Sequence, residues 1–356
     1  MIDLVELDET HRPVFEELLR ESWQQNWPAD VARQIVNWRY YERPGEAITW
    51  LALERGKKGA STRCIAILDS ILRPYMMNRE RIWVRETADW YCTPSRRQYG
   101  IGLWLLRQMV ARHPEPVFVL GGSALTLELL PKLKWTVLPA AGSYILPITA
   151  RGLMANMLRQ RWWKYEKFAR AVPRVVNVRG PRRVAPPAGR RATMRQLAKA
   201  DTVVLDPPQQ DGLVQLLESP HWHWLARMPP CLAQPICLLF LLDDVPAGIT
   251  FSQVEPAASG LDARIVHLQV TDPAMNAWVI SETTRLLADH GVEFVRCCVS
   301  TSDKITAVEE VGYIKSKDMP CHWWPNHAGT PCQIDVGYLR GDDAMPFQAL
   351  RGRSHV

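Results

Sequence analysis

The sequence lacks several features that would direct it to particular compartments or cofactors. Its 356 residues contain no apolar run long enough to span a bilayer, and its start does not resemble a signal peptide. The eight cysteines are irregularly spaced and include no C-x-x-C pair, which disfavours a disulfide framework or a common zinc-site spacing. We therefore expect a cytoplasmic protein with reduced cysteines and no metal.

A group of potential metal ligands near the C-terminus has an alternative interpretation as a loop. The candidate zinc ligands are Cys321, His322, His327 and Cys332. Their proline-rich surroundings favour a loop instead. His221 and His223 flank Trp222, where ordinary packing or a pocket wall is favoured over metal ligation.

Charge and length limit the class of protein further. The net charge of +6 is compatible with polyanion binding, but the arginines do not form one continuous helical stripe. We therefore do not expect nucleic acid as a partner. With 47% hydrophobic residues, the chain can bury more than one sizeable core.

Three segments are predicted along the chain: a domain over 1–150, a connecting segment over 151–192 and a second domain over 193–356. The connecting segment starts with a basic, tryptophan-containing helix over 153–171. That helix fits either a membrane surface or packing between the domains, and we favour packing. The proline- and arginine-rich stretch 174–191 is the predicted linker.

Hydrophobic periodicity predicts an alternation of strands and helices in the first domain. The predicted strands are 2–7, 48–53, 64–72, a strand ending at 92, 117–120 and 143–148. The predicted helices are 12–23, 29–41, 103–111 and 124–133.

The second domain repeats this plan. The predicted strands are 236–242, 248–254, 264–270 and 293–299, and the predicted helices are 277–290 and 304–311. A weak internal repeat of this kind predicts a tandem of two similar folds.

The stretch Asp89 to Gly102 is the most informative part of the sequence. It is a strand followed by a turn containing Gly100 and Gly102 and then by a helix. Glycines lack a Cβ, so an anionic ligand can approach the backbone, and N–H groups at the helix start point toward it. Neither GxGxxG nor GxxxxGKS/T is present at this turn, so a phosphate site of another kind is predicted. An ordinary strand-to-helix turn is the alternative.

The spacing Arg97-x-x-Gly100-x-Gly102 after a strand resembles the acyl-CoA-binding motif of the GNAT N-acyltransferases. The order of strands and helices over the first 150 residues is similar to that family. The resemblance implies an α/β fold of two tandem GNAT-like domains, each a mixed central sheet flanked by helices. A weaker resemblance, carried by Trp38, Tyr40 and Pro44-Gly45, is to GNAT proteins of polysaccharide biosynthesis.

The resemblance also implies roles for individual residues. The backbone near Trp90, Tyr91 and Cys92 would pair with the pantetheine arm and supply an oxyanion N–H group. The pyrophosphate of acetyl-CoA or another acyl-CoA would lie against Arg96, Arg97, Gln98, Tyr99, Gly100, Ile101 and Gly102.

Transfer to an amine needs a base, and the resemblance implies which residue supplies it, because Asp89 stands at a position of this strand that is frequently acidic in the family. Asp89 is the candidate base, directly or through water, although a substrate-binding or solvated carboxylate is the alternative. Leu130 stands where many members of the family have a tyrosine that acts as the acid. Ser123 is a substitute donor, or simply a helix N-cap.

The second domain departs from the motif. Residues 271–277 contain no glycine and no basic residue, so we expect no coenzyme there. This domain would cap the first, complete the acceptor pocket or support a homodimer. The first domain departs from the family pattern as well, at Lys134-Trp135.

Two hypotheses remain open at this stage. One is an acyl-CoA-dependent N-acyltransferase for a small amine or amino sugar, for example a surface-glycan precursor. The other is a non-catalytic module that binds acyl-CoA or a partner protein. For the acceptor, Trp38, Trp83 and Trp90 are the candidate contacts, because flat rings stack on sugars and planar groups.

Overall fold

The computed structural model describes residues 2–23, 28–56, 62–162, 180–198, 205, 211–257, 260–326 and 328–338. Within these ranges, none of the helices has the length and apolar character needed to cross a membrane.

Among the described residues, the first part of the chain forms six strands and six α-helices. They are β1 (Ile2–Glu6), α1 (Arg12–Trp23), α2 (Ala29–Val36), β2 (Ala47–Glu54), β3 (Arg63–Met77), β4 (Glu80–Cys92), α3 (Pro94–Arg97), α4 (Ile101–Arg112), β5 (Val117–Leu120), α5 (Ala124–Lys132), β6 (Thr136–Pro147) and α6 (Ala150–Trp162).

These elements confirm the order predicted for the first domain, with differences in extent, among them β6, which starts at Thr136 rather than at 143. The predicted helix 29–41 is α2 followed by a π-helix over Asn37–Tyr41. Strands β3 and β4 are longer than predicted, because together they form a hairpin that extends to Met77 and Glu80. Of the predicted basic helix, 153–162 lies in α6, and 163–171 lies outside the described residues, as does 174–179 of the predicted linker; the rest of that linker, 180–191, forms no helix or strand.

The described residues of the second part form eight strands and three α-helices. They are β7 (Ala192–Gln196), β8 (Leu213–Gln215), α7 (Ser219–Ala226), β9 (Gln234–Leu242), β10 (Val245–Ala257), β11 (Gly260–Val270), α8 (Asn276–Asp289), β12 (Phe294–Val299), α9 (Ser302–Val311), β13 (Ile314–Trp324) and β14 (Ile334–Asp335).

The predicted loop around Cys321 and His322 was wrong. Both residues lie in β13, which pairs with β5 on one side and β6 on the other. Tight pairing to two strands fixes this segment despite the prolines nearby. The sequence pattern does not predict α3, β7, β8, α7 or β14, which are short or carry no clear period.

One mixed sheet runs through the whole molecule. Its main order is β1-β2-β3-β4-β5-β13-β6-β12-β11-β10-β9-β7, and β8 and β14 lie off this path. Strand β13 of the second part lies between β5 and β6 of the first, and β6 pairs with β12 of the second. Each part therefore pairs its last long strand with an inner strand of the other: β6 with β12, and β13 with β5.

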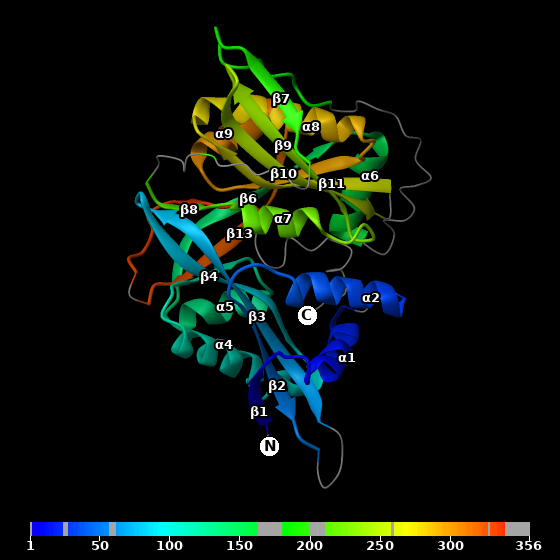
Figure 1. Ribbon diagram of the computed structural model, residues 1–356, viewed down its shortest axis with the longest axis vertical. Helices are drawn as coiled ribbons and strands as arrows, with labels where there is room; N and C mark the ends of the chain where they lie inside the picture. The colour runs from blue at the N-terminus through cyan, green and yellow to red at the C-terminus, as the bar shows by residue number, and fades with distance from the viewer. Residues whose placement is uncertain are drawn as a thin grey trace.

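Figure 1 shows how this exchange arranges the molecule. Strands β1 and β2 with α1 and α4 lie at one end, and β7, α8 and α9 lie at the other. Strands β6, β8 and β13 and helix α7 lie between them. The arrangement confirms the prediction of central mixed sheets flanked by helices.

Buried apolar side chains explain why the helices lie where they do. On α1, Phe15, Leu18 and Leu19 are buried, at the spacing of one helical face. On α4, Leu105, Leu106 and Met109 are buried in a cluster with residues of β2, β3 and β5. Packing of α4 against this face fixes the direction of the turn that precedes it.

Candidate functional site

Strand β4 is irregular near its end. Ala88 pairs with Asp69 and Tyr91 pairs with Ile67, so Asp89 and Trp90 together lie opposite the single residue Leu68 of β3. Asp89 has a φ of 45°, in the left-handed region. This is a β-bulge, which bends a strand and redirects its side chains and amides.

At the same place, β4 parts from its other neighbour. The parallel pairing of β4 with β5 is confined to Arg85 with Val117 and Glu86 with Phe118. Beyond this point β5 continues beside β13, where Leu120 pairs with Cys321. The later part of β4 therefore faces β5 without ladder pairing in the described residues, and an extended ligand arm can hydrogen-bond to such an edge as a strand does.

The turn after β4 is exposed and leads into α4 without a side-chain cap. Gln98, Tyr99 and Gly100 are exposed. Gly100 is the N-cap of α4 with a φ of 70°, and an added Cβ there would meet nothing within 4 Å. The first amides of a helix carry partial positive charge and lack intrahelical partners, so this turn suits an anion.

Gly102 has a different role from Gly100. An added Cβ at Gly102 would lie 2.9 Å from the indole nitrogen of Trp90, and that nitrogen donates a hydrogen bond of 3.0 Å to the carbonyl of Gly102. The glycine thus lets Trp90 pack directly on the start of α4, which ties the bulged strand to the helix.

Two arginines flank the turn. Arg96 forms an ion pair of 2.9 Å with Glu54, which raises the pKa of the guanidinium. Arg97 donates from Nε to the carbonyl of Cys92 at 2.9 Å and lies over the Tyr91 ring at 5.7 Å. Burial raises the pKa of the Cys92 thiol, so this cysteine stays protonated near neutral pH.

The corresponding turn of the second part is closed by its own side chain. A carboxylate oxygen of Asp272 accepts a hydrogen bond of 2.9 Å from the amide of Ala274, and Pro273 has no amide hydrogen to offer. A carboxylate in this position repels an anion, which gives a physical reason for the expected loss of the pyrophosphate site.

The gap between the second pair of parallel strands is also occupied. Strands β11 and β12 pair only from Asp262 with Phe294 to Ile265 with Cys297. Just beyond, an added Cβ on Gly337 would lie 2.8 Å from the carbonyl oxygen of Val266. The chain's own segment after β14 therefore lies where the strands part.

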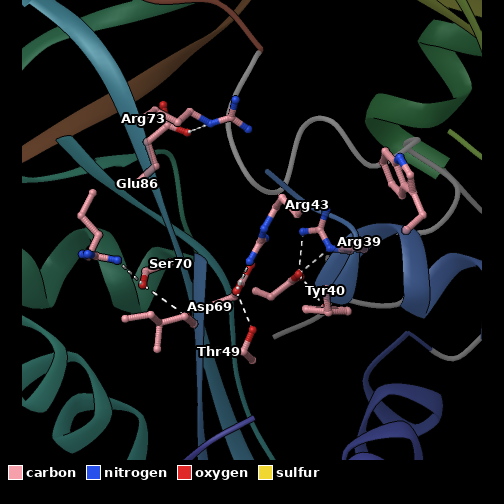
Figure 2. A network of polar contacts seen from close by, with 12 residues as sticks. Arg39, Tyr40, Arg43, Thr49, Asp69, Ser70, Arg73 and Glu86 are labelled. Carbon is pink, nitrogen blue, oxygen red and sulfur yellow. Dashed lines mark hydrogen bonds and ion pairs between the residues drawn. The ribbon is translucent and has the colours of Figure 1, made fainter. Parts of the chain in front are cut away.

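Buried ion pairs lie on the bulged strand and its neighbour (Figure 2). Asp89 is fully buried, and one carboxylate oxygen accepts hydrogen bonds from Nε of Arg39 at 2.6 Å and from the hydroxyl of Tyr40 at 2.7 Å. Both partners come from the π-helix after α2. The predicted base is thus held in a defined orientation by two donors.

Two further carboxylates are held in the same way. Asp69 of β3 accepts from both terminal nitrogens of Arg43, at 2.6 and 2.8 Å, and from Thr49. Glu86 of β4 pairs with Arg73 at 3.0 Å, and both are buried. Figure 2 shows Asp69 with Arg43 and Thr49, and Glu86 with Arg73. Sequence reasoning missed these pairs, since charges inside apolar strands signal burial but do not identify their partners.

The three tryptophans proposed as acceptor contacts do not form one wall. Trp38 is buried and stacks on Trp224 of α7, with ring centroids 4.7 Å apart, and each indole donates to the other's carbonyl. Trp83 is 44% exposed, near the start of β4 beside Arg81. Trp90, near the end of β4, is the one that touches the α4 turn.

The remaining candidate residues lie in helices α5 and α7 or at their ends. Ser123 is the N-cap of α5, because its hydroxyl accepts from the amide of Thr126 at 3.2 Å. Leu130 is fully buried. His221 lies buried in α7, and burial lowers its pKa to about 3. Among the residues that the structure describes, no three His, Cys, Asp or Glu side chains are grouped as metal ligands.

Two comparisons by sequence, with family models and with curated proteins, find no match to this chain. The structure, in contrast, resembles solved structures along most of its length. A tandem GNAT protein from the clavulanic acid biosynthesis pathway has a TM-score of 0.51 and 13% identity, over 92% of this chain and 100% of that one.

Two further structures agree with this comparison. A GCN5-related N-acetyltransferase from Anabaena variabilis has a TM-score of 0.54 and 11% identity, over 91% of this chain and 72% of that chain. The Saccharomyces cerevisiae N-myristoyltransferase with bound myristoyl-CoA has a TM-score of 0.56 and 9% identity, over 93% and 84% of the two chains. At these identities the likeness concerns the fold, and it confirms the predicted tandem GNAT-like architecture.

Proposed function

From the tandem GNAT fold of this chain, we propose that the protein is an acyl-CoA-dependent N-acyltransferase. The acyl group, in the simplest case acetyl, passes directly to an amine of a small molecule or an amino sugar, of which a surface-glycan precursor is one example. One observation carries the proposal. An exposed, uncapped helix start with Gly100 in the left-handed region directly follows a bulged strand that parts from its parallel neighbour.

The coenzyme is proposed to bind along this strand and turn. Its pyrophosphate lies against the turn from Gln98 to Gly102 and the first amides of α4, with Arg96 and Arg97 adding positive charge. Its pantetheine arm lies beside the unpaired edge of β4. The second half supports this assignment by contrast, since Asp272 and the segment at Gly337 take up the equivalent positions there.

The proposed reaction needs no covalent enzyme intermediate. The amine nitrogen attacks the thioester carbonyl, the carbon–nitrogen bond forms, and the carbon–sulfur bond breaks to release the coenzyme thiolate. An amide near Tyr91 or Cys92 stabilises the oxyanion. Asp89 takes the amine proton directly or through water, and Ser123 is the proposed donor to the thiolate. Of the three tryptophans, Trp90 is best placed to contact an acceptor.

A binding function without turnover is the second candidate, and two observations favour it. Asp89 is fully buried in an ion pair, and Leu130 replaces the tyrosine that the family resemblance would lead one to expect. A protein of this kind retains the coenzyme site but transfers nothing.

Thiol release from acetyl-CoA, measured with a panel of amines that includes glucosamine, tests the proposal. We expect thiol release that depends on an amine and that is lost in the double variant Gly100→Ala/Gly102→Val. Coenzyme binding with no amine-dependent thiol supports the binding module. Absence of both contradicts both functions.

A further inference from the structure

A second cavity lies outside the proposed coenzyme site. It has a volume of about 190 Å³ and is enclosed by β8, the end of β11, the first turns of α8 and α9, and the segment Asp335 to Gly337. A buried water needs only about 10–15 Å³ of such volume, so this space admits a small organic molecule. It lies in the second half, beside the segment at Gly337 that fills the place where β11 and β12 part.

Two buried polar side chains line this cavity with atoms that have no partner among the described residues. His267 and Asn276 are 4% and 3% exposed. Nε2 of His267 and Oδ1 of Asn276 make no hydrogen bond within the described part of the chain. A buried polar atom without a hydrogen bond destabilises the protein, so a ligand that bonds to these two atoms removes that cost.

The cavity wall favours a hydrogen-bond donor. Burial and the nearby ammonium of Lys304 lower the pKa of His267 to about 4, so the imidazole is neutral near pH 7 and one of its nitrogens can accept. The carbonyl oxygen of the Asn276 side chain is an acceptor as well. A ligand that carries several N–H groups matches both atoms.

The charges of the wall differ between its buried and its exposed end. Lys304 donates to both carboxylate oxygens of Asp335, at 2.7 and 2.8 Å, and to the carbonyl of Leu268 at 2.8 Å. Asp335 therefore offsets part of the Lys304 charge, while at the buried end the ammonium still disfavours a proton on His267. Asp303 also lines the cavity and is exposed, so the charged lining carries one more acidic than basic group.

We infer that this cavity is a binding site for a small primary amine. The inference does not depend on the proposed transferase reaction. It does connect the two halves, because Gln215 lines the cavity and donates to Glu86 of β4 at 2.6 Å. Glu86 is the last residue of β4 that pairs with β5. The side chain of Gln215 therefore links the cavity to the residue at which β4 and β5 separate.

Calorimetric titration with 1,4-diaminobutane and glucosamine, beside 1,4-butanediol, glucose and propionate, tests this site. We expect both amines to bind at least tenfold more tightly than the other three probes. Thr271 lies exposed at the cavity, so Thr271→Trp should abolish amine binding. Ala274→Trp, an exposed change three residues along that is not part of the lining, should leave it unchanged.

A third variant tests amine binding without introducing a tryptophan. Asp303→Asn changes one exposed carboxylate, and we expect it to weaken amine binding at least threefold. The inference is overturned if neither amine binds, if the diol, glucose or propionate binds as tightly as the amines, or if amine affinity is the same in Thr271→Trp and Asp303→Asn as in the unchanged protein. Titration of coenzyme A into the same variants measures the affinity of the proposed coenzyme site separately.

Discussion

Asp89 and Asp69 are two buried carboxylates with similar partners and different places in the fold. Each is fully buried and each is bound by an arginine. Only Asp89 lies at the bulge, beside the edge where the thioester is proposed to bind. Substituting each aspartate in turn therefore distinguishes an effect on catalysis from an effect on stability.

Asp89→Asn should lower kcat for amine acylation by about 10²- to 10⁴-fold, the usual contribution of a general base. Asparagine tolerates the left-handed φ of this position, so coenzyme affinity should be unchanged. The variant should also lose stability, by roughly 3 kcal/mol, because Arg39 keeps its buried charge.

Asp69→Asn is the matched control for this change. It should cost similar stability in urea unfolding while kcat stays near that of the unchanged protein. Equal loss of kcat in both variants would remove Asp89 from the role of base.

His221 is a buried imidazole whose titration should destabilise the protein in acid. Its pKa falls from 6.5 to about 3, because burial and the charges of Arg73 and Arg43 disfavour the protonated form. Between these values the unfolded chain binds a proton that the folded chain does not. The stabilising contribution is therefore complete above pH 6.5 and is lost as the pH falls toward 3.

Urea unfolding at pH 7 and pH 5 measures this effect. His221→Phe should reduce the loss of stability between the two pH values by about 2 kcal/mol, the linkage expected for a pKa of 6.5 in the unfolded chain. Exposed His290→Gln is the control and should behave as the unchanged protein does. An identical acid loss in His221→Phe would mean that another group is responsible.

For single residues, the sequence predicted the glycines of the turn but not the partners of Asp89. The glycines of the turn were identifiable because few residues tolerate a positive φ, and Gly100 does adopt one. The partners of Asp89 were not identifiable, because Arg39 and Tyr40 lie about fifty residues away and only the folded sheet brings them to β4.

Among the elements, α6 shows how closely the two parts of the chain are joined. Its Gly152 lies against the residue before β12, and an added Cβ would lie 2.0 Å from the carbonyl oxygen of Glu293. The same carbonyl accepts from the amide of Ile148 at 2.9 Å. A helix that follows the first part is thus anchored on the second.

Gly152→Ala should destabilise the protein by about 1–3 kcal/mol, because the methyl group must displace backbone. Helix propensity alone would give the opposite sign, about 1 kcal/mol of stabilisation. Urea unfolding measures the difference, with exposed Met154→Ala as a control expected to change stability by less than about 0.5 kcal/mol. A more stable Gly152→Ala protein would contradict the packing described here.

Elements with strong periodicity were predictable and those held by distant pairing were not. Helix α1 and strand β5 have the predicted bounds because their apolar pattern is local. Strand β13 is polar and exposed in its first half, and its position depends on β5 and β6, more than 160 residues earlier.

Over the whole molecule, the exchange of strands makes each part incomplete alone. Without β13, the facing edges of β5 and β6 have no partner in the described sheet, and without β6 the same holds for β12. The tandem repeat was visible in the sequence, but a repeat does not reveal which copy supplies a given strand.

We therefore predict that residues 1–170 and 171–356, produced separately, do not fold, and that together they form one soluble complex. Circular dichroism of each fragment and co-purification of a tagged pair provide the measurement. Two fragments that each unfold cooperatively as monomers would contradict the shared sheet.

The central claim is that the turn at Gly100 holds the diphosphate of an acyl-CoA, and coenzyme A titration tests it most directly. The double variant Gly100→Ala/Gly102→Val should bind coenzyme A at least about tenfold more weakly than the unchanged protein, a loss of about 1.4 kcal/mol. Gly189 has a similar φ, 74° against 70°, and equally open surroundings, so Gly189→Ala imposes the same strain elsewhere and should bind normally. Equal affinity in the double variant and the unchanged protein, or no binding by the latter, would contradict the account.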